Sequence, residues 1–129
     1  MAEQIYLTEV TEIGVEVPDF LETGLMILFE SGAPPELAEI SVQHTPTTRR
    51  DEPPEPGDVL LLGESEFRIT AVGYKAWQNV TDLGHAVFKF DGQQEPELPG
   101  QIHLDGPDAD KLPDLISPGL RIEIRKGGL

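Results

Sequence analysis

Three histidines, His44, His85 and His103, carry the chemistry that this sequence offers near neutral pH. The chain has no cysteine, which excludes thiolate chemistry and disulfides. The hydrolase motif GxSxG and the phosphate-binding loop GxxxxGK[ST] are both absent. What remains is histidine as a nucleophile, because a neutral imidazole can attack phosphorus and form a phosphohistidine.

His44 has the surroundings that such a site would need. We expect it at the end of a strand, beside Thr45, Thr47 and Thr48, whose hydroxyl and backbone N–H groups could donate to phosphoryl oxygens. His85 follows the end of a predicted helix, where backbone groups are often left without partners. From spacing alone, the commoner alternative is that these histidines are ordinary hydrogen-bonded side chains.

A metal site is the other chemistry that histidines suggest. No HxH or HxxxH spacing links the three, although a barrel could still bring them together with carboxylates. We therefore expect no metal and no cofactor, and a metal-binding barrel is a distant alternative.

Alternation of apolar and polar residues with a period of two dominates the chain and predicts the strands that position these histidines. About eight short strands, separated by glycine and proline, are typical of an antiparallel barrel or sandwich. The predicted fold is therefore all-β, an antiparallel barrel-like domain with one short helix. The expected strands cover residues 5–13, 25–29, 37–44, 59–62, 67–72, 86–90, 101–104 and 120–124.

The helix is expected at residues 75–83, where Ala76, Val80 and Leu83 share a face and Gly84 ends it. Residues 34–37 could add one helical turn. The segment 47–57 (TTRRDEPPEPG) is polar, rich in proline and without periodicity, which predicts a mobile loop between strands. Because neither side of this loop is long enough to fold alone, we expect one domain over residues 1–129.

The formal net charge of -15 restricts the partners of this protein. Such a surface repels phosphate backbones and anionic lipids, so we expect no nucleic-acid partner. A basic protein would be attracted, and the alternative is that the charge serves solubility alone. The start, MAEQIYLTEV, lacks the regions of a signal peptide, and no apolar run could span a bilayer. We therefore expect a cytoplasmic protein without direct membrane insertion.

Four blocks of the sequence resemble one protein family. ILFESGAPPELAEISVQHTP (27–46) resembles the glucitol/sorbitol-specific IIA component of the bacterial phosphoenolpyruvate-dependent sugar phosphotransferase system. The resemblance continues in PGDVLLLGESEFRITAVG (56–73), NVTDLGHAVFKFDG (79–92) and LPGQIHLDGP (98–107). The blocks follow the order of the family and cover most of the chain. Residues 47–56 depart from the family pattern, because they are more acidic and richer in proline.

This resemblance implies a phosphoryl relay with His44 as the acceptor. It makes His85 a neighbour that orients or stabilises the phosphate, and His103 a structural residue. Such a protein would accept phosphate from the phosphocarrier protein HPr and pass it to the IIB domain of the IIB/IIC permease for glucitol or sorbitol. The alternative is a non-catalytic binding or regulatory domain that keeps the barrel and senses the phosphotransferase system.

Arg49 and Arg50 follow His44 closely and could offset the charge of a phosphoryl group. The alternative is a solvated pair that Asp51 and Glu52 neutralise.

Overall fold

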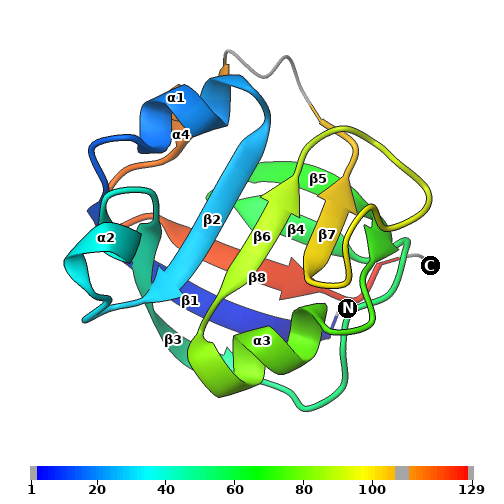
Figure 1. Cartoon of the computed structure of the whole chain (residues 1–129). Helices are drawn as coiled ribbons and strands as arrows, with labels where there is room; N and C mark the ends of the chain where they lie inside the picture. Colours follow the sequence, from blue (N-terminus) through cyan, green and yellow to red (C-terminus); the bar gives the residue numbers. More distant parts are fainter. Residues whose placement is uncertain (1–2, 107–110, 128–129) are drawn as a thin grey trace.

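The strands of this chain close into a barrel in the computed structural model, which describes residues 3–106 and 111–127 (Figure 1). The order around the barrel is β1-β3-β2-β6-β7-β5-β4-β8, and β8 pairs back onto β1. The strands are β1 (Gln4–Ile13), β2 (Leu25–Glu30), β3 (Val42–Arg49), β4 (Val59–Leu62), β5 (Ser65–Val72), β6 (Ala86–Lys89), β7 (Gln101–Leu104) and β8 (Arg121–Arg125). The described part also contains the short helices α1 (Val17–Glu22), α2 (Pro35–Ala38), α3 (Ala76–Leu83) and α4 (Leu112–Leu115). The predicted all-β barrel of eight strands is confirmed.

Two neighbouring pairs of strands are parallel, β2 with β3 and β6 with β7, so the sheet is mixed. Antiparallel neighbours can be joined by a tight turn, as β4 and β5 are, whereas parallel neighbours need a longer crossover. Residues 31–41 cross over from β2 to β3 through α2, and residues 90–100 cross over from β6 to β7. Alternation along a strand does not reveal its direction, which is why the sequence predicted only antiparallel pairs.

The interior of the barrel is mostly apolar, because most of the alternate side chains that the strands turn inward are apolar. On β1 the inward row is Tyr6, Thr8 and Val10, and Thr8 stands out as a fully buried polar residue. The other strands fill the interior with branched side chains, including Leu28, Leu60, Leu62, Ile69, Ile102, Leu104, Ile122 and Ile124.

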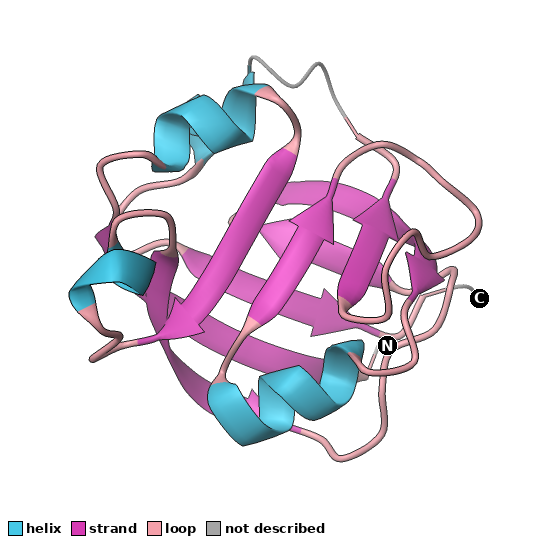
Figure 2. Cartoon of the chain, viewed as in Figure 1, coloured by secondary structure: helices cyan, strands magenta, loops and turns pink. Residues whose placement is uncertain are grey.

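Short helices cover both ends of the barrel, as Figure 2 shows. Helix α1 leads into β2, lies beside α4 and buries Val17 and Leu21, while α4 buries Leu112. Helix α3 leads into β6 and buries Trp77 and Val80. Because β2 and β6 are antiparallel neighbours, the helices that precede them lie at opposite ends. None of the described helices is long and apolar enough to cross a membrane.

The strand predicted at residues 37–44 is wrong in its position. The chain forms the short helix α2 and a turn before β3 begins at Val42, and β3 then continues to Arg49. His44 therefore lies within a strand and not at its end, and part of the loop predicted at 47–57 is strand. The reason is that β3 pairs with β1 along its whole length, a backbone interaction that polar side chains do not reveal.

The helix predicted at residues 75–83 is confirmed as α3, and the predicted helical turn is α2. Gly84 ends α3 in the left-handed region, with φ of 63°. The strands predicted at residues 59–62 and 67–72 are β4 and β5, which pair as an antiparallel hairpin. Helices α1 and α4 were not predicted. They span six and four residues, with a proline as the second residue of each, and are too short for a clear helical period.

Candidate active site around His44

His44 is the third residue of β3, which lies between β1 and β2. Its register partners are Val10 on β1 and Glu30 on the parallel strand β2. The side chain points into the barrel, because Val10 belongs to the inward row of β1, and it is fully buried, with 0% exposure. A phosphoryl acceptor needs a ring nitrogen that the donor can reach, so a His44 that accepts phosphate would have to be uncovered first.

Both ring nitrogens of His44 have partners at short range. Nε2 lies 2.7 Å from the carbonyl oxygen of Gly84, and Nδ1 lies 2.7 Å from Thr8 Oγ1 and 3.3 Å from the Tyr6 hydroxyl. A carbonyl oxygen only accepts hydrogen bonds, so Nε2 carries a proton and donates it to Gly84. In the neutral ring, Nδ1 then accepts from the Thr8 hydroxyl.

The imidazole of His44 is held neutral. Burial lowers its pKa below the ordinary value, and this outweighs the opposing effects of the Gly84 carbonyl and the Glu30 carboxylate. Burial also raises the pKa of Tyr6 far above its ordinary value, so that its hydroxyl keeps its proton. A neutral imidazole is the form that can act as a nucleophile.

Thr8 is the site residue that the sequence reasoning missed. The hydroxyl donors were expected from Thr45, Thr47 and Thr48, which follow His44 in the chain, yet none of these bonds its ring. Thr8 reaches the ring from the neighbouring strand, 36 positions away. The signal that could have found it is its place between Tyr6 and Val10 on the inward row of β1.

Gly84 is positioned over His44 by the end of helix α3. Its N–H donates to the carbonyl oxygen of Val80 at 3.0 Å, and its own carbonyl turns toward Nε2 of His44. The positive φ favours glycine, and a Cβ at this position would lie 2.5 Å from the Cβ of Glu30. A residue with a side chain therefore fits poorly here for two independent reasons.

His85 follows Gly84, but its ring does not join that of His44. Its Nδ1–H donates to the carbonyl oxygen of Leu28 at 3.2 Å, and its ring lies 5.4 Å from that of Phe29. Leu28 points into the barrel and Phe29 alternates with it, which places the His85 ring on the outer side of the wall. Within the described residues no hydrogen bond joins the two imidazoles. We expected His85 to be a neighbour of His44. The structure places the Gly84 backbone, next to His85, against His44, but it does not bring the two rings together.

His103 lies elsewhere, buried on β7. Its Nδ1–H donates to Asp91 at 2.9 Å, and its Nε2 accepts from the backbone N–H of Glu97 at 3.1 Å. These contacts hold the crossover between β6 and β7, which fits a structural role.

A pocket of about 310 Å³ is lined in part by Glu30, the register partner of His44 on β2. We call it the Arg49 pocket, and it is lined by Glu30, Pro46, Thr47, Thr48 and Arg49. Nη1 of Arg49 lies 3.5 Å from the Val80 carbonyl oxygen, the same oxygen that accepts the N–H of Gly84. The guanidinium and the Gly84 peptide are therefore neighbours.

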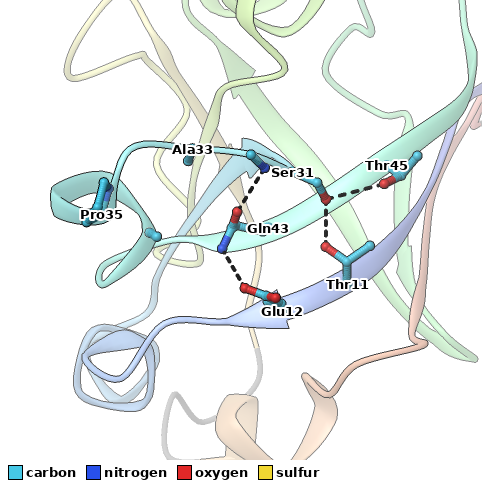
Figure 3. A pocket seen from close by; sticks show the side chains of 9 residues that line it. Thr11, Glu12, Ser31, Ala33, Pro35, Gln43 and Thr45 are labelled. Atoms are coloured by element: carbon cyan, nitrogen blue, oxygen red, sulfur yellow. Dashed lines mark hydrogen bonds between the residues drawn. The ribbon is translucent and has the colours of Figure 1, made fainter.

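A second pocket, of about 530 Å³, lies between β1, β3 and the loop after β2 (Figure 3). In it the hydroxyl of Ser31 contacts those of Thr11 and Thr45, and the amide of Gln43 donates to Glu12. The N–H of Ser31 also donates to the backbone carbonyl of His44, at 2.9 Å. This network ties the backbone of His44 to both neighbouring strands.

Comparison with known proteins decides the family. A family model described as the PTS system glucitol/sorbitol-specific IIA component matches residues 5–123. The chain belongs to this family.

Relatives of this IIA component support the assignment. The glucitol/sorbitol-specific EIIA components of Shigella flexneri and Escherichia coli (strain K12) are each 38% identical over 115 residues, which is 89% of either chain. A crystal structure of a PTS system IIA component from Enterococcus faecalis V583 matches with a TM-score of 0.71 at 25% identity, covering 90% of this chain and 96% of that one. The resemblance inferred from the four sequence blocks is thus confirmed.

The IIA components are relay proteins of a sugar phosphotransferase system, and this chain is one of them. In the described part of the chain, no group of three or more histidines and carboxylates is arranged to hold a metal ion.

Proposed function

We propose that this protein accepts a phosphoryl group from HPr on His44 and passes it to the IIB/IIC permease of a glucitol/sorbitol system. The observation that carries the proposal is a neutral imidazole, held between Thr8 and Gly84, in a chain of this family. The protein would act as a single relay domain in the cytoplasm, without cofactor or metal.

Nε2 is the nitrogen best placed to receive the phosphoryl group. Nδ1 faces Thr8 and Tyr6, which are buried deep in the barrel. Nε2 faces the Gly84 carbonyl, which belongs to a loop beside the Arg49 pocket. Access to Nε2 needs a movement of one peptide, whereas access to Nδ1 would need the barrel itself to open.

The covered arrangement is the resting state of the relay. In it Nε2 carries the proton, and attack on phosphorus requires its lone pair. The proton must therefore move to Nδ1 when the Gly84 carbonyl withdraws. Thr8 suits this exchange, because a hydroxyl can either donate to Nδ1 or accept from Nδ1–H.

The transfer step balances without a further reactant. The lone pair of Nε2 on His44 forms the new P–N bond, while the P–N bond of the donor phosphohistidine breaks and its electron pair returns to the donor nitrogen. Nδ1 of His44 keeps its proton, and the donor ring keeps one on its other nitrogen. Because a P–N bond forms as one breaks, the step is nearly reversible, as a relay requires.

His85 has contacts that support a positioning role. Direct stabilisation of the phosphate, the role that the resemblance implies, would require its ring to leave Leu28 and Phe29. Where it stands, the ring anchors the peptide that covers His44. The proposal for His85 is therefore control of that peptide, with contact to the phosphate only after the peptide moves.

The test is phosphorylation with phosphoenolpyruvate, enzyme I and HPr, followed by intact-mass measurement. We expect one phosphoryl group, labile in acid and stable in base, and we expect none on His44→Gln. Glutamine is the better replacement, since alanine would leave a cavity and an unpaired Thr8 hydroxyl in the barrel. Circular dichroism checks that the variant folds, and normal labelling of a folded His44→Gln would reject the assignment.

A second measurement separates the relay from a regulatory domain that senses the phosphotransferase system. The labelled protein is isolated and mixed with the IIB domain of a glucitol permease. A relay loses its label to IIB within the mixing time, whereas a sensor retains it. Retention of the label would favour the regulatory alternative.

A further inference from the structure

Two walls of the Arg49 pocket are next to the Gly84 peptide, which covers Nε2 of His44. Glu30, on one wall, is the register partner of His44 and lies against Gly84, whose carbonyl covers Nε2. Arg49, on another wall, shares the Val80 carbonyl oxygen with the N–H of Gly84. Withdrawal of the Gly84 carbonyl would therefore join Nε2 to this pocket.

A phosphoryl group at this place would meet unfavourable charges. It carries roughly two negative charges near neutral pH, and Glu30 adds another on the pocket wall. The carbonyl end of helix α3, which lies at Gly84, is also the negative end of the helix dipole. Arg49 is the cation among the residues that line the pocket.

Arg49 is held loosely enough to turn toward such a group. It pairs opposite Tyr6 in the β1–β3 ladder, so its side chain leaves the sheet on the same side as that of His44. Its bond to the Val80 carbonyl is long, at 3.5 Å, and no carboxylate of the described residues pairs with it. Arg50 differs, because its guanidinium pairs with Glu3 at 3.2 Å and its carbonyl accepts from Trp77 Nε1.

We propose that Arg49 is a catalytic residue that binds the phosphoryl oxygens during transfer to and from Nε2 of His44. This inference rests on the function proposed above. The guanidinium offers two parallel N–H donors to the oxygens and balances the charge of Glu30.

The experiment compares Arg49→Gln, Arg49→Lys and, as the matched control, Arg50→Gln, each of which changes one side chain of the same arginine pair. Labelling is followed by intact mass with two donors, phosphorylated HPr and the small molecule phosphoramidate. A lost hydrogen bond to a charged group predicts that Arg49→Gln slows labelling about 10- to 100-fold with either donor. Arg49→Lys should recover part of the rate, and Arg50→Gln should stay close to wild type.

Each outcome distinguishes the inference from the function on which it rests. If wild type takes no label on His44 from either donor, the proposed function fails and the role of Arg49 fails with it. If wild type is labelled and Arg49→Gln matches Arg50→Gln, the function stands and the inference is overturned. If Arg49→Gln is slow with HPr but normal with phosphoramidate, Arg49 serves docking of the carrier, which also overturns the inference.

Discussion

At the scale of the residue, the burial of His44 makes the fold sensitive to mild acid. The pKa of the buried ring lies below its ordinary value of 6.5. Below pH 6.5 the unfolded chain therefore binds a proton that the folded chain takes up less readily. The free energy of unfolding must then fall as the pH drops from there toward the lowered pKa, by up to about 1.4 kcal/mol per pH unit.

Urea unfolding of wild type and His44→Gln, between about pH 7.5 and 5.5, measures this effect. Carboxylates with ordinary pKa values near 4 remain ionised in this range, so their contribution to the slope is small. We expect a clear loss of stability with falling pH in wild type and a flatter curve in His44→Gln. Equal slopes would contradict the neutral, buried ring that the structure assigns to His44.

At the scale of the element, the end of helix α3 places the Gly84 carbonyl against Nε2 of His44. Gly84 combines a φ of 63° with a backbone that presses against Glu30. Gly84→Ala should lower the free energy of unfolding by the roughly 1–2 kcal/mol that the left-handed conformation costs a residue with a Cβ. The contact of the new Cβ with the Glu30 Cβ should lower it further. The Gly84 carbonyl would move, and the ¹⁵N chemical shifts of the His44 ring should report a weaker hydrogen bond from Nε2 to this carbonyl.

Gly92→Ala is the matched control for this prediction. Gly92 also has a positive φ, of 71°, but the nearest atom to a Cβ there is the Asp105 Cα at 4.0 Å. Both variants therefore meet the same backbone strain, and only Gly84→Ala meets a close neighbour. Equal losses of unfolding free energy in the two variants, with unchanged ¹⁵N chemical shifts of the His44 ring, would show that the Gly84 peptide is not held firmly against Glu30 and His44.

At the scale of the whole molecule, the net charge of -15 predicts that encounter with a basic carrier is steered by electrostatics. Asp51 and Glu52, which follow the Arg49 pocket along the chain, are exposed, as are Glu36 and Glu39 near the second pocket. Reversing Asp51 and Glu52 to lysine should lower the initial rate of phosphotransfer from HPr and flatten its dependence on salt.

The control for net charge alone is the double variant Glu64→Lys and Glu66→Lys, which changes the net charge by the same amount as reversal of Asp51 and Glu52. Both residues are exposed, and β5, which carries Glu66, lies across the barrel from β3 in the strand order. We expect this pair to leave transfer nearly unchanged. Equal effects of the two pairs in a salt series would mean that the charge acts on solubility and not on docking at this face.

Much of the fold could be predicted from the sequence, because it rests on local patterns. Alternation with a period of two marks strands, and the apolar face ahead of Gly84 marks α3 and its end. The extension of β3 through polar residues 45–49 could not be predicted in this way, since it depends on pairing with β1. The parallel pairs were missed for a similar reason: strand direction is set by crossovers and not by side chains.

The candidate site, too, could be predicted from the sequence only in part. His44 was singled out from the sequence because histidine can act as a nucleophile in a chain without cysteine, and because the family resemblance implies His44 as the phosphoryl acceptor. Its partners, Thr8 and the carbonyl of Gly84, come from segments 36 and 40 positions away. The pairing of β1 with β3 brings Thr8 to His44, and the next strands in the order, β2 and β6, bring Gly84 to it. Burial in the barrel then lowers the pKa of the ring. Residue types determined which chemistry was available, and tertiary contacts decided its protonation state and access, because both depend on neighbours that are distant along the chain.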